Sequence, residues 1–208
     1  MKRYFITGTD TDCGKTYVTT SLLNCFPGSI AIKPIASGCI ESEACLISPD
    51  AQLLQENCSL SLDEINPWRF KSPVSPHIAA KEHGIRVSVR NIADYCLNLR
   101  TDSDLMFVEG AGGLQVPLND DETWVDFLNL THMPVLLVVG MKLGCINHAL
   151  LTVQALLRNK INCAGWVANC IDPAMNSLTE NIDTLREWLK IPYLGCCPYK
   201  GGLEGISL

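Results

Sequence analysis

The feature that most restricts the fold of this chain is a glycine-rich segment directly behind its first apolar run. The strand-like run Tyr4–Thr7 leads into residues 8–16, which read Gly-Thr-Asp-Thr-Asp-Cys-Gly-Lys-Thr, and a helical pattern follows. Gly-Lys-Thr between a strand and a helix is typical of a loop that holds nucleotide phosphates on backbone N–H groups and on the helix N-terminus. In such a loop Gly14 allows close approach, Lys15 reaches the outer phosphates and Thr16 can bind Mg²⁺. The segment therefore predicts a site for magnesium-ATP.

The spacing of this loop differs from the common one. Five residues separate Gly8 from Gly14, where four are usual. A chance Gly-Lys-Thr in an ordinary loop is the alternative interpretation. The strand before the segment, the helix after it and its place near the N-terminus all favour the phosphate loop.

Strand-like runs alternate with helical patterns along the rest of the chain. Several runs are apolar at every position, as expected for strands covered on both faces. This alternation predicts an α/β fold of the P-loop NTPase type, with a mostly parallel central sheet and helices on both faces, in a single domain over residues 1–208. The runs are Tyr4–Thr7, Ala31–Ile32, Leu105–Val108, Val135–Val139, Trp166–Ala168 and Tyr193–Leu194.

Two helices are expected near the C-terminal end, and one surface segment near the middle. Ser177 with Glu180 matches a capping box in front of the second helix. The Ser- and Pro-rich section Ser59–Pro76 is expected to run as an ordered surface excursion. The apolar set of the first helix is Leu150, Val153 and Leu157, and that of the second is Leu178, Ile182, Leu185 and Leu189.

Composition excludes several classes of function. The net charge is −6 and no cluster of Lys and Arg stands out, so nucleic-acid binding is not expected. The longest apolar stretch, Val135–Val139, is too short to span a bilayer. Eleven cysteines occur without any C-x-x-C spacing, which favours reduced thiols in a cytoplasmic protein over a disulfide scaffold or a zinc site.

A phosphate loop needs carboxylates to complete its magnesium site. Glu109 follows a strand-like run and precedes a Gly-Ala-Gly-Gly segment, which places it at the ligand-binding edge of a parallel sheet. Asp50 stands at an expected helix start, where a helix N-cap is an equally good interpretation. Lys33 ends the second strand; it is either a solvated strand-end lysine or a second cation beside the γ-phosphate.

The chain resembles the dethiobiotin synthases over nearly its whole length and in order. The run that starts at Lys142 is particularly specific, because a general P-loop ATPase does not reproduce it. The matching segments are Thr7–Thr11 with Gly14–Thr16, Lys33-Pro34 with Ala36–Gly38, Asn66-Pro67, Ser75–Ile78, Val108–Gly113, Pro134-Val135, Lys142–Ala149 and Gly165–Asn169.

This resemblance implies a reaction and a set of site residues. Diaminopelargonic acid takes up CO₂ on one amine as a carbamate, ATP phosphorylates the carbamate, and the second amine closes the ring and expels phosphate. Lys33, Lys15 and Thr11 are implied to be catalytic, while Thr16, Asp50 and Glu109 hold Mg²⁺. Implied nucleotide contacts are Asp12, Cys13, Gly14, Lys15, Thr16, Tyr17, Asp50, Glu109, Gly110, Ala111, Gly112, Asn169, Pro198, Tyr199 and Lys200; implied substrate contacts are Thr11, Ser37, Gly144, Cys145, Ile146 and Asn147.

The resemblance also implies a homodimer with a shared active site. The substrate's distal carboxylate is held at the start of a helix from the neighbouring subunit, here residues 144–147, whose N–H groups suit an anion. Without the family context, an ordinary helix start is the preferred interpretation of Gly144.

The chain departs from the family pattern at two places, and a cysteine in its loop suggests a further test. Asp12 stands where relatives often carry Glu, and the stretch after Gly201 is shorter than the family arm over the purine, where Glu204 is a candidate for the ribose. Cys13 suggests inhibition by thiol reagents, with a small filler residue as the alternative.

Two other classes of ATP-using protein compete with this interpretation. Regulatory partitioning or site-placement ATPases carry an additional lysine early in the loop, whereas residues 9–12 here are not basic. Amidating enzymes of the cobyrinic acid synthase type need a further glutamine-hydrolysing domain, for which 208 residues leave no room.

Overall fold

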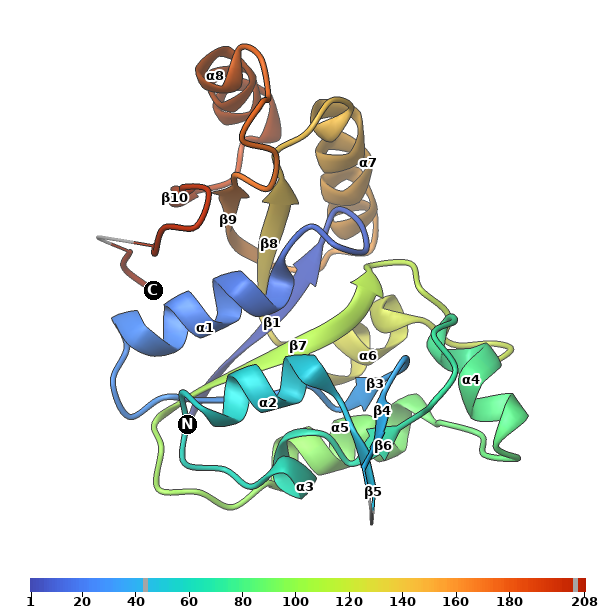
Figure 1. Cartoon of the computed structure of the whole chain (residues 1–208). Helices are drawn as coiled ribbons and strands as arrows, with labels where there is room; N and C mark the ends of the chain where they lie inside the picture. Colours follow the sequence, from blue (N-terminus) through green and yellow to red (C-terminus); the bar gives the residue numbers. More distant parts are fainter. Residues whose placement is uncertain (43–44, 204–205) are drawn as a thin grey trace.

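A six-stranded, fully parallel sheet forms the centre of the computed structural model, which describes residues 1–42, 45–203 and 206–208. The strand order is β10-β9-β8-β1-β7-β2, and every pairing in the sheet is parallel. The sheet confirms the predicted α/β fold class (Figure 1). Its strands are β1 (Lys2–Gly8), β2 (Ile30–Ile32), β7 (Leu105–Gly113), β8 (Val135–Gly140), β9 (Cys163–Asn169) and β10 (Tyr193–Cys197).

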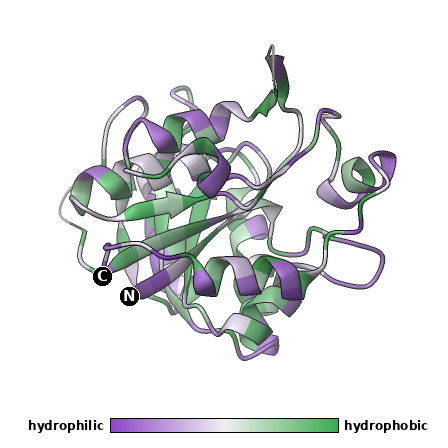
Figure 2. Cartoon of the chain, turned by 90° about the horizontal axis from the view of Figure 1, so that it is seen from below, coloured by the Kyte–Doolittle hydropathy of each residue, from purple (hydrophilic) through white to green (hydrophobic). Residues whose placement is uncertain are grey.

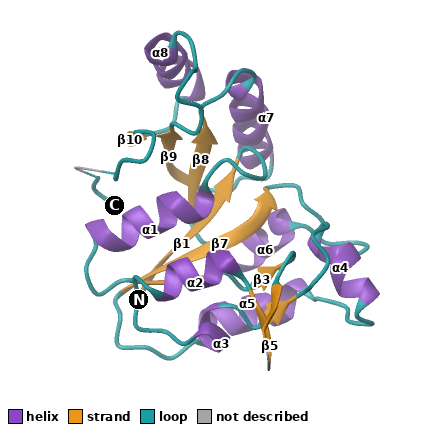
Figure 3. Ribbon diagram, viewed as in Figure 1, coloured by secondary structure: helices purple, strands orange, loops and turns teal. Residues whose placement is uncertain are grey.

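Helices cover both faces of this sheet. Helices α1 and α2 lie over one face, and α5 and α6 lie over the other (Figure 3). The central strands consist largely of hydrophobic residues, coloured green in Figure 2, as expected for strands covered on both faces. The helices are α1 (Lys15–Cys25), α2 (Pro49–Gln55), α3 (Leu62–Ile65), α4 (Pro76–Glu82), α5 (Val89–Asn98), α6 (Trp124–Thr131), α7 (Cys145–Arg158) and α8 (Leu178–Leu189).

An aromatic cluster fixes α6 against the sheet. The rings of Phe5, Trp124 and Phe127 have centroids 5.1 to 5.5 Å apart and are fully buried. Trp124 Nε1 also donates a hydrogen bond of 2.9 Å to the carbonyl of Ala111. Because Ala111 lies in the last part of β7, the cluster holds the end of the strand that carries Glu109.

The section between β2 and α4 is more structured than its composition indicates. It contains a two-stranded parallel sheet, β3 (Ile35–Ala36) with β6 (Trp68–Arg69), and an antiparallel pair, β4 (Ile40–Ser42) with β5 (Cys45–Ile47). Residues Ser59–Pro76 are ordered as predicted, but Asn66 and Phe70 within them are buried. The excursion is therefore partly core and not wholly surface.

Two local predictions are wrong, and one predicted helix, α7, buries partly different positions from its expected apolar set. Ser177 precedes α8 with φ 53° and ψ 41°, a left-handed conformation in which its side chain makes no capping bond. Asp50 is not an N-cap, because the Ser48 side chain accepts the first bond of α2, from the N–H of Ala51. In α7 the buried positions include Ala149 and Leu156, whereas Leu157 is 63% exposed.

The helix caps of α6 and α8 differ in their hydrogen bonds, and this difference predicts different effects of substitution on stability. The Thr123 hydroxyl accepts the N–H of Val125, and the Asp126 carboxylate accepts the N–H of Thr123, forming a capping box at α6. Thr123→Ala is expected to lower the free energy of unfolding by about 1 kcal/mol, and Ser177→Ala by less than about 0.5 kcal/mol. Urea unfolding of the two variants checks this. Equal losses at the two sites would contradict the assignment of the caps.

The helices are short compared with the thickness of a bilayer. Across the ranges 1–42, 45–203 and 206–208, every helix is too short or too polar to cross a bilayer. The longest of them, α7, has 14 residues. Its apolar side chains divide between the core and solvent, as in a helix that packs on one side of a sheet.

Candidate active site

The phosphate loop joins β1 to α1 and is held by glycine contacts. Gly14 is left-handed with φ 82°, and a Cβ there would come 2.0 Å from Asn169 Nδ2. Asn169 in turn donates a hydrogen bond of 2.8 Å from Nδ2 to the carbonyl of Cys13. Only glycine fits this position, and Asn169 fixes the backbone of the loop from the end of β9.

Cys13 packs into the sheet below the loop. Its side chain is fully buried, and a Cβ on Gly8 would lie 2.2 Å from its Sγ. A Cβ on Gly140 would likewise approach the Cys13 Cα to 2.9 Å. The structure supports the interpretation of Cys13 as a filler residue, because thiol reagents do not reach a fully buried sulfur.

The loop brings Lys15 and Thr16 to the start of α1. Both residues are largely buried. Lys15 Nζ donates a hydrogen bond of 3.0 Å to the carbonyl of Asp10, and Thr16 Oγ1 donates one of 2.6 Å to Glu109 Oε1. The ammonium thus lies over the loop, and the hydroxyl lies beside a carboxylate from the neighbouring strand β7.

Glu109, Lys33 and Asp50 form one charged network. Glu109 is fully buried within β7, which continues to Gly113 and does not end before it as predicted. Lys33 Nζ donates 2.9 Å to Glu109 Oε1 and also forms an ion pair with Asp50. Burial alone would lower the pKa of Lys33, but attraction to Glu109 and Asp50 outweighs it and the pKa is raised. Lys33 is therefore a fixed cation.

The acceptors of this network match the needs of Mg²⁺. Glu109 Oε2 is buried and has no hydrogen-bond partner among the described residues, a costly state for a carboxylate oxygen unless a cation or water approaches it. Within the described residues, no group of three or more His, Cys, Asp or Glu side chains is arranged to hold a metal ion by itself. The residues present fit a hard cation held by two carboxylates and the Thr16 hydroxyl.

Two clefts meet at the phosphate loop. One, of about 380 Å³, is lined by Lys15, Thr16, Lys33 and Asp50 together with Tyr17 and Leu53. The other, of about 490 Å³, is lined by Ser37, Ala111 and residues 73–76. They share Thr11, Asp12 and Gly112. The structure thus brings the predicted catalytic, metal-binding and amine-binding residues to one continuous region.

The segment predicted to face adenine lies after β10. Tyr17 Oη donates a hydrogen bond of 3.0 Å to the carbonyl of Gly201, so this segment is tied to α1. Tyr199 is 48% exposed, and the ammonium of Lys200 lies 5.4 Å from its ring centroid. The contacts of residues 198–200 with adenine stay a prediction, and Glu204 lies outside the described residues.

The start of α7 has only part of the geometry expected of an anion site, because the N–H of Cys145 already donates to the carbonyl of Lys142 at 3.0 Å. Gly144 is left-handed with φ 94° and precedes Cys145, whose side chain is buried. Leu143 is 98% exposed. The role of residues 144–147 as a substrate site for a neighbouring subunit stays a prediction.

One ion pair near the loop was not predicted. Lys142 Nζ donates a hydrogen bond of 2.9 Å to Asp10 Oδ2. Lys142 follows β8 and Asp10 follows β1, and these strands are neighbours. The rule that the carboxyl ends of parallel strands share one edge of the sheet points to this pair as well as to Glu109.

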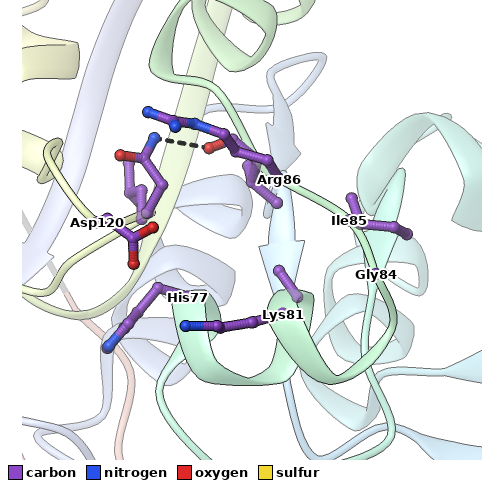
Figure 4. Close-up of a pocket in the computed structure, with 10 residues that line it drawn as sticks. His77, Lys81, Gly84, Ile85, Arg86 and Asp120 are labelled. Atoms are coloured by element: carbon purple, nitrogen blue, oxygen red, sulfur yellow. Dashed lines mark hydrogen bonds between the residues drawn. The ribbon is translucent and has the colours of Figure 1, made fainter.

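A separate cavity of about 230 Å³ lies between α4 and the segment that precedes α6 (Figure 4). Its lining includes His77, Lys81, Arg86 and Asp120 and shares no residue with the two clefts. Arg86 forms an exposed ion pair of 2.9 Å with Asp121.

The fold and the loop define the class of protein, a P-loop protein that binds ATP. A family model described as an AAA domain matches residues 2–207. Among solved structures, a ParA family ATPase from Chlorobium tepidum TLS is 14% identical with a TM-score of 0.58, covering 96% of this chain and 86% of that one. The septum site-determining protein MinD from Pyrococcus horikoshii OT3, complexed with Mg-ADP, is 16% identical with a TM-score of 0.56, covering 95% and 81%. At these identities the likeness concerns the fold alone.

Sequence relatives are far closer and specify the family. The ATP-dependent dethiobiotin synthetase BioD of Legionella pneumophila (strain Paris) is 59% identical over 209 residues, covering 100% of this chain and 99% of the relative. The enzyme of the same name from Nitrosospira multiformis is 46% identical over 204 residues, covering 95% and 88%. The chain belongs to the ATP-dependent dethiobiotin synthetase family.

Proposed function

We propose that the chain closes the ring of dethiobiotin from diaminopelargonic acid and CO₂ at the expense of ATP, as a ligase of biotin biosynthesis. The observation that carries this proposal is the 59% identity, over the full length, to a relative named for that reaction. The two clefts at the phosphate loop support it, because a space lined by Lys15 and Thr16 adjoins a second, larger space that could take the diamine.

The reaction runs in three steps. One amine of the substrate adds to CO₂ and loses a proton, which gives a carbamate. A carbamate oxygen then attacks the γ-phosphorus of ATP, ADP leaves, and a carbamic-phosphoric anhydride forms. The second amine attacks the carbonyl carbon of the anhydride, phosphate leaves, and the ureido ring closes. Because both amines belong to one molecule, the last step needs only correct positioning.

Two lysines provide the charge for phosphoryl transfer. Lys15, at the end of the phosphate loop, and Lys33 line the same cleft. Both ammonium groups are largely buried, so their field at the transferred phosphoryl group is little screened by water. In this proposal they neutralise the charge shared between the carbamate and the γ-phosphate.

The amine end of the substrate occupies the second cleft. Thr11 and Ser37 line it with hydroxyl groups, and Thr11 also lines the nucleotide cleft. A hydroxyl at that junction can donate to the carbamate while the nucleotide is bound. Asp12 lines both clefts too, with a shorter reach than the Glu that relatives often carry there.

Thr16, Asp50 and Glu109 would hold Mg²⁺. The unpartnered Oε2 of Glu109 supports this assignment. Held by these residues, the ion would supply positive charge against the phosphates during transfer. The loop residues 12–17, residues 109–112, Asn169 and residues 198–200 would surround the nucleotide.

We also propose that the enzyme is a cytoplasmic homodimer whose subunits share active sites. The start of α7, residues 144–147, would bind the distal carboxylate of the substrate held by the partner. Leu143 beside it is 98% exposed, and Leu151 further along α7 is 56% exposed. Burial of such side chains against a second copy would remove apolar area from water.

Phosphate release from Mg-ATP tests the proposed reaction. Release is expected only with diaminopelargonic acid and bicarbonate together, and mass spectrometry should detect dethiobiotin in equal amount. The control is the Lys15→Met variant, which should bind the diamine but release no phosphate. Release without the diamine, or none with it, would contradict the proposal. A requirement for a partner protein or lipid would instead favour the regulatory ATPase class.

A further inference from the structure

We propose that the Asp10–Lys142 ion pair is a positioning device that joins the phosphate loop to the start of α7 and thereby sets the affinity for the diamine substrate. This inference rests on the proposed function, because the α7 start is assigned there to the substrate carboxylate. Neither residue contacts the reacting atoms in that proposal. Both act through the segments that they connect.

Asp10 anchors three different groups with its three oxygen atoms. Its carbonyl accepts from Lys15 Nζ at 3.0 Å, its Oδ1 accepts from the N–H of Thr11 at 2.8 Å, and its Oδ2 accepts from Lys142 Nζ at 2.9 Å. The Lys142 hydrogen bond is also the main reason that the pKa of Asp10 is lowered. The side chain of Asp10 therefore joins Thr11 to a segment more than 130 positions away in the chain, and its main-chain carbonyl holds Lys15.

Lys142 lies at one end of a short segment whose other end, Cys145, is anchored in the core. Its carbonyl accepts the N–H of Cys145 at 3.0 Å, so it closes the first turn of α7. Between them, Leu143 is 98% exposed, and a Cβ on Gly144 would meet nothing within 4 Å. The side chain of Lys142 makes the described hydrogen bond that ties this turn to the phosphate loop. Its loss would let the exposed part of the turn, residues 143–144, shift relative to the loop while Cys145 stays packed in the core.

In the proposed dimer, the Asp10–Lys142 pair connects sites that serve two different subunits. The α7 start of each chain serves the site of its partner, whereas Asp10 belongs to the chain's own phosphate loop. The pair would therefore link the nucleotide site of one subunit to the carboxylate site that this subunit offers to the other. The loss of the pair should weaken diamine binding more than it slows phosphoryl transfer.

Three variants isolate the pair. Asp10→Asn keeps an oxygen for the Thr11 N–H but removes the charge, Lys142→Met keeps the aliphatic stem, and the double variant lacks both charges. Each single variant should raise the KM for diaminopelargonic acid about fivefold, with a smaller change in kcat. The double variant should be no worse than either single one, because the same interaction is lost. Lys142→Arg should restore most of the affinity.

The Arg86–Asp121 pair is the matched control, because it has the same 2.9 Å separation and is also exposed. Arg86→Met and Asp121→Asn should leave the KM for the diamine unchanged. Additive losses in the double variant, an unchanged KM in the single variants, or an equal effect at the control pair would overturn the inference. Absence of diamine-dependent phosphate release in the unaltered protein would overturn the proposed function itself, and this inference with it.

Discussion

Replacement of Lys33 with methionine is expected to slow phosphoryl transfer by about 10²- to 10³-fold, the usual loss when one charge-stabilising donor is removed. Lys33 Nζ bridges Asp50 and Glu109, and its side chain is only 9% exposed. Its raised pKa means that the stability due to this charge is present below the ordinary lysine pKa and lost only as pH rises through the folded value. The rate should therefore show no titration of Lys33 near neutral pH. Single-turnover phosphate release at saturating diamine measures the effect.

The same substitution also leaves Glu109 buried without its cation, which is expected to cost about 3–5 kcal/mol of folding free energy. A double variant, Lys33→Met with Glu109→Gln, removes both charges and should recover part of that stability but none of the rate. Urea unfolding of both variants separates the two effects. A folded Lys33→Met protein that keeps more than a tenth of the rate would contradict the catalytic role. Recovery of the rate in the double variant would assign the loss to misfolding.

The sheet and the edge at which its site lies were predictable because every strand of a parallel sheet shows the same sequence pattern. A strand buried on both faces must be apolar throughout, and the residue that follows it stands at the ligand-binding edge. Lys33 was found in this way, directly after β2, and Glu109 after the apolar part of β7, although that strand continues to Gly113. Their mutual contact was not predicted, because the sequence does not show that β2 and β7 are neighbours.

The predictions were wrong where two segments have similar sequence patterns and only the backbone conformation distinguishes them. Ser177 has the right spacing to Glu180 for a capping box, but its left-handed φ turns the hydroxyl away from the helix. Thr123 with Asp126 forms such a box although Asp is less usual than Glu in that pattern. The Asp10–Lys142 pair was missed because neither residue follows a strand directly: each lies two residues beyond one.

Replacement of Glu109 with glutamine is expected to raise the Mg²⁺ concentration for half-maximal activity at least about tenfold. Glu109 Oε1 already accepts from Thr16 Oγ1 at 2.6 Å and from Lys33 Nζ at 2.9 Å, while Oε2 has no partner among the described residues. Glutamine can keep its oxygen toward these two donors and place its amide where Oε2 stood. The substitution thus preserves the packing and removes only the oxygen that faces the proposed metal.

Binding of ATP with and without Mg²⁺ isolates this effect from catalysis. The unaltered protein should bind Mg-ATP more tightly than metal-free ATP, and Glu109→Gln should lose most of that difference while its affinity for metal-free ATP is retained. The matched control is Glu122→Gln, an acceptor of the Val89 N–H that lines neither cleft of the site. An unchanged Mg²⁺ requirement in Glu109→Gln would show that the metal is held without this side chain, and that Oε2 is satisfied by water.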